Sequence, residues 1–190
     1  MRDAVSDALD RLAADEGVKV VVVTGAGDVF SAGFDLREFE QPELAKELWA
    51  SSDRFHRAWL EFALPTVAAV NGPALAGGFD VAVMCDVRVA ADTASFSHPE
   101  LAFGDVVYGP LHDLVGGSVA RDLCLTGRIL DAAEALTLGF VSSVVSVEEL
   151  PAHAAQTAGA IARAPRDVLL RTKAKIIRRA DVVRENTLDL

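Results

Sequence analysis

The sequence predicts an α/β protein, and three observations lead to this fold class. Apolar runs at residues 19–24 and 67–70 have the length and composition of buried strands, and a glycine-containing turn follows each of them. Apolar residues at helical spacing lie before and between these runs. The third observation is the segment 77–84, in which a glycine pair opens an apolar run that is expected to be a helix. Strands that alternate with helices in this way are typical of an α/β fold.

The composition fits one globular domain. With 190 residues, of which 51% are hydrophobic, the chain can bury a sizeable core. Its formal net charge of −10 argues against a nucleic-acid partner, because the phosphates would be repelled. No apolar run reaches the roughly 18 residues that span a bilayer, and the first residues lack a signal-peptide pattern. Cys85 and Cys124 lie in apolar runs and are expected to be buried free thiols, so we expect a cytoplasmic protein.

The N-terminal half contains two expected amphipathic helices. Val5, Leu9 and Leu12 recur at helical spacing, which predicts a helix over residues 2–14 before the first strand. A second apolar stripe predicts a core-facing helix between residues 37 and 63. This second stripe consists of Leu44, Leu48, Phe55, Trp59 and Phe62.

The C-terminal half continues the alternation. Asp131 and Glu134 have the spacing of a capping box, and Gly139 is expected to close that helix in a left-handed conformation. The other expected elements are strands at 87–90, 95–97 and 141–145, a helix that starts at 146–149 and breaks at 163–165, and a last helix through 169–177.

Basic residues cluster near the C-terminus. Such a cluster on a helix is usually a solvated face, although it can also meet a ligand phosphate or an acidic neighbour. The cluster consists of Arg163, Arg166, Arg171, Lys173, Lys175, Arg178 and Arg179.

Two glycine-rich loops offer free backbone N–H groups. One is the small-residue loop at 30–36, and the other is the pair Gly77-Gly78 at an expected helix start, where N–H groups are unpaired and the helix dipole is positive. Close helix–strand packing is the alternative reason for a glycine pair. Two such loops would supply two donors to an oxyanion, each worth about 3 kcal/mol in a transition state. The turn at 25–27 is no dinucleotide fingerprint, because Phe30 stands where the third glycine is required.

Several short motifs share an order and spacing that carry a family resemblance. They are Val22-Val23-Thr24-Gly25-Ala26-Gly27, Phe30-Ser31-Ala32-Gly33-Phe34-Asp35-Leu36, Ala69-Val70-Asn71-Gly72, Gly77-Gly78-Phe79-Asp80, Cys85-Asp86, Phe96-Ser97-His98-Pro99-Glu100, Leu125-Thr126-Gly127-Arg128, Ala132-Ala133-Glu134-Ala135 and Gly139-Phe140-Val141. Together they resemble the enoyl-CoA hydratase/isomerase (crotonase) family over roughly residues 6–180.

The resemblance implies a fold and an assembly. The fold is the crotonase-like ββα spiral with peripheral helices, assembled as a homo-trimer or a dimer of trimers. Residues 1–190 are then a single crotonase-like domain, shortened at the N-terminus and possibly at the C-terminus relative to the family, with a C-terminal helical segment at 165–190. Family contacts to coenzyme A made by strands before residue 2 are therefore not carried over. The substrate is an acyl-CoA thioester, with coenzyme A as part of the substrate and no permanently bound cofactor.

The resemblance also assigns site residues. The backbone N–H groups of Phe34 and Gly77 form an oxyanion hole for the thioester carbonyl, and Asp80 and Glu100 are the acid/base carboxylates. The residues implied to bind substrate or coenzyme A are Ala32, Leu36, Arg37 and Tyr108.

Five of the residues near the implied site have alternative roles. A salt bridge of Arg37 with Glu38 or Glu40 is as good an expectation as a phosphate contact. Tyr108 stands where dienoyl isomerases of the family carry a second Asp, and either donates a proton or packs by its ring. The aromatic residues that are either core or pocket wall are Trp49, Phe55 and Trp59.

The reaction depends on the two carboxylates. Hydration needs one carboxylate to activate water and one carboxyl group to deliver a proton, both within ~3 Å of that water. Hydratases of the family carry Glu where this chain has Asp80, whereas isomerases can carry Asp there. Enoyl-CoA hydration is the favoured function, followed by enoyl-CoA double-bond isomerisation and by a non-catalytic acyl-CoA-binding role. If these carboxylates have no catalytic role, Asp80 is an acidic residue in the first turn of a helix, facing the positive end of the helix dipole, and Glu100 is an ordinary surface residue.

The histidines complete the candidate list. His98, beside Glu100, is expected to tune or contact the substrate, whereas His56 and His153 are expected on helix surfaces. His112 precedes a glycine-serine stretch, but the pattern of a nucleophile elbow fails at Ala120, which argues against a serine hydrolase. No His, Cys and acid spacing in the sequence predicts a metal site.

Overall fold

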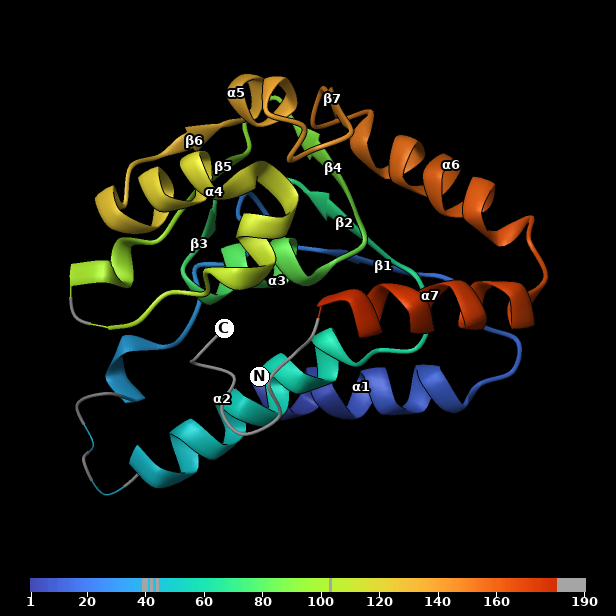
Figure 1. The fold of residues 1–190 in the computed structure, drawn as a ribbon, viewed down its shortest axis with the longest axis horizontal. Helices are drawn as coiled ribbons and strands as arrows, with labels where there is room; N and C mark the ends of the chain where they lie inside the picture. The colour runs from blue at the N-terminus through green and yellow to red at the C-terminus, as the bar shows by residue number, and fades with distance from the viewer. Residues whose placement is uncertain (39–40, 42, 44, 103, 181–190) are drawn as a thin grey trace.

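A four-stranded parallel sheet forms the centre of the chain (Figure 1). The computed structural model describes residues 1–38, 41, 43, 45–102 and 104–180. In spatial order the strands of this sheet are β1 (Val21–Thr24), β2 (Thr66–Val70), β4 (Val87–Ala91) and β7 (Ser143–Val145).

Strand β2 is buried on both faces, which explains the uninterrupted apolar run at residues 67–70 that follows its first residue, Thr66. Val67 and Ala69 pack on one face in a cluster that includes Leu150 of helix α6. Ala68 and Val70 face the larger core cluster on the other side. Side chains that alternate between two covered faces need apolar residues at every position of the strand.

A second, smaller sheet lies beside the first. Its strands are β3 (Ala74–Leu75), β5 (Ser95–Ser97) and β6 (Leu130–Asp131), with β3 and β5 parallel and β5 and β6 antiparallel. Strand β3 follows β2 after a short turn and leads directly into the helix α3. The α/β fold expected from the sequence is therefore confirmed. The chain runs from β2 of the first sheet through β3 of the second sheet into one central helix.

The helices surround these sheets. Helix α3 is central, and Gly78 through Met84 are all buried in it. Figure 1 shows α6 along one side of the main sheet and α1 beside α2 on the other side of the molecule. The helices are α1 (Arg2–Ala14), α2 (Ala45–Leu60), α3 (Gly77–Met84), α4 (Gly109–Thr126), α5 (Ala132–Thr137), α6 (Leu150–Ala162) and α7 (Arg166–Ala180), with 3-10 turns η1 (Leu36–Glu38) and η3 (Pro99–Ala102).

Most element boundaries agree with the sequence prediction, and three differ. The helices expected at 2–14 and 77–84 are confirmed, as are the Asp131 cap, which accepts a hydrogen bond from the Glu134 N–H at 2.8 Å, and the left-handed Gly139. The first strand is shorter than 19–24, and the strand expected at 141–145 covers only Ser143–Val145. The helix expected to start at Ser146 begins at Leu150, after a turn in which Ser146 and Glu149 make the two reciprocal bonds of a capping box, each at 3.4 Å. Leu44 lies outside the described residues, while the buried stripe of α2 includes Leu48 and Phe55.

The basic cluster does not form a uniform solvated face. Lys173 of α7 is only 4% exposed, and its Nζ lies 2.7 Å from each carboxylate oxygen of Asp86. The backbone N–H and the hydroxyl of Thr66 also donate to Asp86, at 2.8 and 3.0 Å. Arg166 donates to backbone carbonyls of Val18 and Ala13. These contacts fasten α7 to the sheet and to the end of α1.

The length and hydropathy of the helices bear on whether any of them could span a membrane. Across the described ranges, none of them is both long and apolar enough to cross a bilayer.

Candidate active site

A cleft of ≈ 280 Å³ opens at the N-terminal end of α3. It is lined by residues from the loop at 32–36, from α2, from the start of α3 and from the segment 99–107. The lining residues are Ala32, Phe34, Leu36, Trp49, Ser52, His56, Ala76, Gly77, Asp80, Pro99, Glu100, Gly104, Asp105, Val106 and Val107. The cleft therefore gathers residues that are far apart in the sequence.

The two glycine-rich loops lie side by side at this cleft. Leu75 N–H donates to the Ser31 carbonyl at 2.8 Å, and a Cβ added to Gly78 would lie 2.2 Å from that same carbonyl oxygen. Only glycine permits this approach. Gly33 has a φ of +84° and its backbone lies against Gly77, so the loop at 31–34 is pressed onto the first turn of α3.

Helix α3 begins at Gly77, and the residue before it is strained. Ala76 has a φ of 52°, the one positive value of a non-glycine residue among those described. Such backbone strain occurs where the surrounding structure fixes a functional geometry. The first N–H groups of a helix have no acceptor within the helix, and Phe34 and Gly77 both line the cleft. Phe34 and Gly77, whose N–H groups are expected to be the oxyanion donors, therefore lie at the same cleft.

Asp80 and Glu100 meet in the same cleft, although they come from α3 and from η3. His98 lies between them, with its Nδ1 2.9 Å from Glu100 Oε1 and 3.9 Å from Asp80 Oδ1. Within the described part of the chain, Asp80 Oδ1 and Glu100 Oε2 are buried and have no hydrogen-bond partner. Each carboxylate thus keeps one oxygen available to a bound molecule.

His56 belongs to this site, and the expectation that it lies on a helix surface is wrong. Its side chain lines the cleft, is 4% exposed and places Nε2 3.5 Å from Asp80 Oδ2. Burial alone would lower the pKa of His56, but the neighbouring Asp80 carboxylate outweighs burial, and the pKa is raised. The available sequence signal was the position of His56, three residues before Trp59 and so on the same side of the helix.

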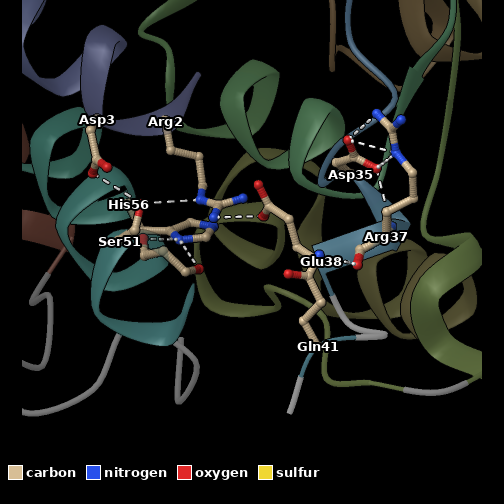
Figure 2. Close-up of polar contacts among 9 residues, drawn as sticks. Arg2, Asp3, Asp35, Arg37, Glu38, Gln41, Ser51 and His56 are labelled. Atoms are coloured by element: carbon tan, nitrogen blue, oxygen red, sulfur yellow. Dashed lines mark hydrogen bonds and ion pairs between the residues drawn. The ribbon is translucent and has the colours of Figure 1, made fainter. Parts of the chain in front are cut away.

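The residues assigned to coenzyme A are only partly at the cleft. Ala32 and Leu36 line it, whereas Arg37 projects outward and pairs with Asp35, with Nε and Oδ1 2.9 Å apart (Figure 2). The hydrogen bonds from Arg37 lower the pKa of Asp35 to about 2. The expected Arg37–Glu38 bridge is wrong, because Glu38 pairs with Arg2 at 2.8 Å. The alternative partner at position 40 lies outside the described residues.

The aromatic candidates separate into two groups. Trp49 lines the cleft, whereas Phe55 and Trp59 are buried core residues with ring centroids 6.3 Å apart. Tyr108 does not line the cleft. It precedes α4, with its ring centroid 5.6 Å from that of His112, and packs against the core.

The remaining residues of interest are Asp105, His153 and the two cysteines. Asp105 is exposed and lines the cleft. His153 is half-buried on α6 and lies 2.8 Å from the Ser143 hydroxyl. The prediction of buried free thiols is confirmed for Cys85 and Cys124, and burial raises their pKa values to about 12 and about 11. The described residues contain no cluster of three or more His, Cys, Asp or Glu side chains that could hold a metal ion.

The chain is similar to known proteins both in sequence and in structure. The family model described as enoyl-CoA hydratase/isomerase matches residues 1–190. The chain is similar to the probable enoyl-CoA hydratase echA8 of Mycobacterium tuberculosis, at 40% identity over 167 residues, which cover 84% of this chain and 63% of that protein. The crotonyl-CoA hydratase of Syntrophomonas wolfei is 35% identical over 164 residues, covering 83% of this chain and 63% of that protein.

Solved structures give the same result. The crystal structure of an enoyl-CoA hydratase from Bacillus anthracis superposes with a TM-score of 0.88 at 30% identity, covering 99% of this chain and 76% of that one. The chain spans 63% of the length of the two curated relatives named above, which is less than two thirds. The matched family, the relatives and the fold agree, and the chain belongs to the enoyl-CoA hydratase/isomerase (crotonase) family.

Proposed function

We propose that this chain processes an acyl-CoA thioester through an enolate, and that the reaction is the hydration of an enoyl-CoA. The observation that carries the proposal is the pair Asp80 and Glu100 in one cleft, joined through His98, each with an unpartnered oxygen. Adding water across a double bond requires a group that accepts a proton from water and a group that delivers one to carbon. Two carboxyl groups beside one cleft supply both roles.

The proposed pose follows from the donors at the cleft. The thioester carbonyl oxygen accepts hydrogen bonds from the N–H groups of Phe34 and Gly77, which stabilise the negative charge of the enolate. The water oxygen then bonds to the β-carbon and a proton adds to the α-carbon, so that the product contains one added water. Ala32 and Leu36 border the coenzyme path, and Arg37 reaches a coenzyme phosphate by exchanging its Asp35 partner. Tyr108 contacts the substrate only if its packing against His112 changes.

Double-bond isomerisation is the second candidate, and the length of Asp80 favours it. Asp is one methylene shorter than Glu, and this difference can move the carboxylate away from a water while one remaining base still shuttles a proton. A third candidate is a protein that binds acyl-CoA without turnover. Loss of the conjugated enoyl absorbance of crotonyl-CoA supports the hydratase. Conversion of a 3-enoyl-CoA into its conjugated isomer without water addition identifies the isomerase, and binding without either reaction identifies the binder.

The oxyanion assignment is tested with Gly77→Pro. Proline has no N–H, so the variant lacks one donor at the carbonyl, and we expect kcat/KM for crotonyl-CoA to fall about 10²–10³-fold. Proline is tolerated at the first turn of a helix, so far-UV circular dichroism should match the parent chain. Full turnover by a folded Gly77→Pro chain would show that this N–H is not an oxyanion donor.

We also propose that the chain assembles as a homo-oligomer. Large apolar side chains are exposed on the consecutive segment from the end of α4 to α5, with Leu125 74%, Ile129 65% and Leu136 44% exposed. Exposed apolar residues gathered in one segment favour association. Light scattering at micromolar concentration should therefore report about three times the 20.1 kDa chain mass, or a multiple of it. A monomer with intact activity would contradict the proposal.

A further inference from the structure

Each ring nitrogen of His56 faces an oxygen atom. Nδ1 lies 2.9 Å from the backbone carbonyl oxygen of Ser52, one turn earlier in α2, and Nε2 lies 3.5 Å from Asp80 Oδ2 on α3. The carbonyl oxygen only accepts, so Nδ1 carries a hydrogen, whereas the contact at Nε2 is an ion pair without a hydrogen bond and is attractive when that nitrogen is also protonated. A histidine ring with hydrogens on both nitrogens is the charged imidazolium.

The charged groups around His56 fit this form. Asp80 from α3 and Asp53 from its own helix both favour the charged ring, and together with the Ser52 carbonyl they raise its pKa despite the opposing effect of burial. Glu100 and Asp105 line the same cleft. The nearby cation is Arg2 of α1, which reaches α2 at Ser51 and pairs with Glu38 (Figure 2).

His98 differs from His56 in where its carboxylates lie. Its Nδ1 faces both Glu100 and Asp80. The Nε2 atoms of His98 and His56 are both buried without a hydrogen-bond partner among the described residues, but only that of His56 has a carboxylate oxygen within ion-pair distance. The His98 ring lies on Phe79 with centroids 4.6 Å apart. His56 is therefore the histidine with an oxygen atom at each ring nitrogen.

We infer that His56 is a positioning residue that acts on the reaction through Asp80. Its imidazolium orients the Asp80 carboxylate through Oδ2, which leaves Oδ1 to accept a proton from the attacking water. Glu100 is then the group that delivers a proton to the α-carbon, and after product release Asp80 gives up its proton to solvent while Glu100 takes one from solvent, so the protons balance over the cycle. This inference rests on the proposed hydration and adds a residue to it.

His56→Gln separates the charge of His56 from its bulk. The glutamine amide keeps an N–H donor but carries no charge, so the Asp80 carboxylate loses its charged neighbour. At the parental optimum kcat should fall about tenfold, because the carboxylate that accepts the proton is then positioned less well, while KM changes less than about twofold.

The alkaline side gives a second signature. The parent chain should lose activity as the pH rises through the raised pKa of His56, since the imidazolium is then lost. The His56→Gln profile should lack that limb. His153→Gln is the matched control, because His153 is a half-buried histidine bonded to Ser143 on the far helix α6. Its profile should superpose on that of the parent chain. A His56→Gln profile that also superposes would overturn the inference.

A measurement without turnover completes the test. Nitrogen NMR of the parent chain should show His56 as an imidazolium near neutral pH, and Asp80→Asn should lower the midpoint of its titration. A neutral His56 ring, or a midpoint that does not move, would show the inference to be wrong even if His56→Gln fails to fold. If the ring behaves as expected but crotonyl-CoA is not hydrated, the proposed function fails while the His56–Asp80 charge pair remains.

Discussion

Glu100→Gln is expected to lower the turnover of crotonyl-CoA by about 10²–10⁴-fold, or roughly 3–5 kcal/mol of transition-state stabilisation. Glutamine keeps the size of the side chain and can still accept a hydrogen bond from His98 Nδ1, which lies 2.9 Å from Glu100 Oε1. It cannot exchange a proton as a carboxyl group does. Glu100 lies in the turn η3 directly after Pro99, whose own φ is fixed by its ring, and the two side chains have the same length, so glutamine should occupy the place of glutamate.

Variants at two other positions make this result interpretable. Glu148→Gln is the same chemical change at an exposed residue before α6 and should leave turnover unchanged. Asp80→Asn should cost about as much as Glu100→Gln if two carboxyl groups hydrate the substrate, and less if one base isomerises it. Asp80→Glu should raise hydration if the reach of the carboxylate is limiting. Should Glu100→Gln leave turnover untouched in a folded chain, the catalytic assignment moves to Asp80 or Tyr108.

Lys173→Met is expected to lower the free energy of unfolding by about 3–5 kcal/mol, the typical cost of leaving a buried charge without its partner. Lys173 Nζ lies 2.7 Å from both Asp86 oxygens, and the side chains of Lys173 and Asp86 are 5% and 14% exposed. Methionine fills a similar volume but leaves the Asp86 carboxylate with only its hydrogen bonds from Thr66. Urea unfolding with an unchanged slope measures the loss.

Lys175→Met provides the matched control for this substitution. Lys175 lies on the same helix but is exposed, so its replacement should change the free energy of unfolding by no more than about 0.5 kcal/mol. Equal effects of the two substitutions would show that the Lys173–Asp86 pair contributes no more than a surface charge.

Local patterns predicted most of the fold. Helix α1 and the start of α3 were predictable because apolar periodicity and a glycine pair are contained in a few consecutive residues. The capping box of Ser146 and Glu149 was predictable for the same reason, although the regular helix begins only at Leu150, after a turn at residues 147–149.

The site shows where local patterns stop being informative. Gly77, Asp80 and Glu100 stand in short motifs, so they could be proposed from the sequence, and all three line one cleft. His56 was missed because its partner Asp80 lies on another helix, and only the packing of α2 on α3 brings them together. For the same reason the basic cluster could be recognised, but its buried member, Lys173, could not be told apart from its exposed neighbours.

The measurement that tests the proposed hydration most directly is the mass of the product formed from crotonyl-CoA in water enriched in heavy oxygen. Hydration at the cleft between Asp80 and Glu100 predicts a product heavier by one water, with the heavy oxygen on the β-carbon and one solvent hydrogen on the α-carbon. A product of unchanged mass in which only the double bond has moved would contradict hydration, as would unreacted substrate recovered from a folded chain that binds it.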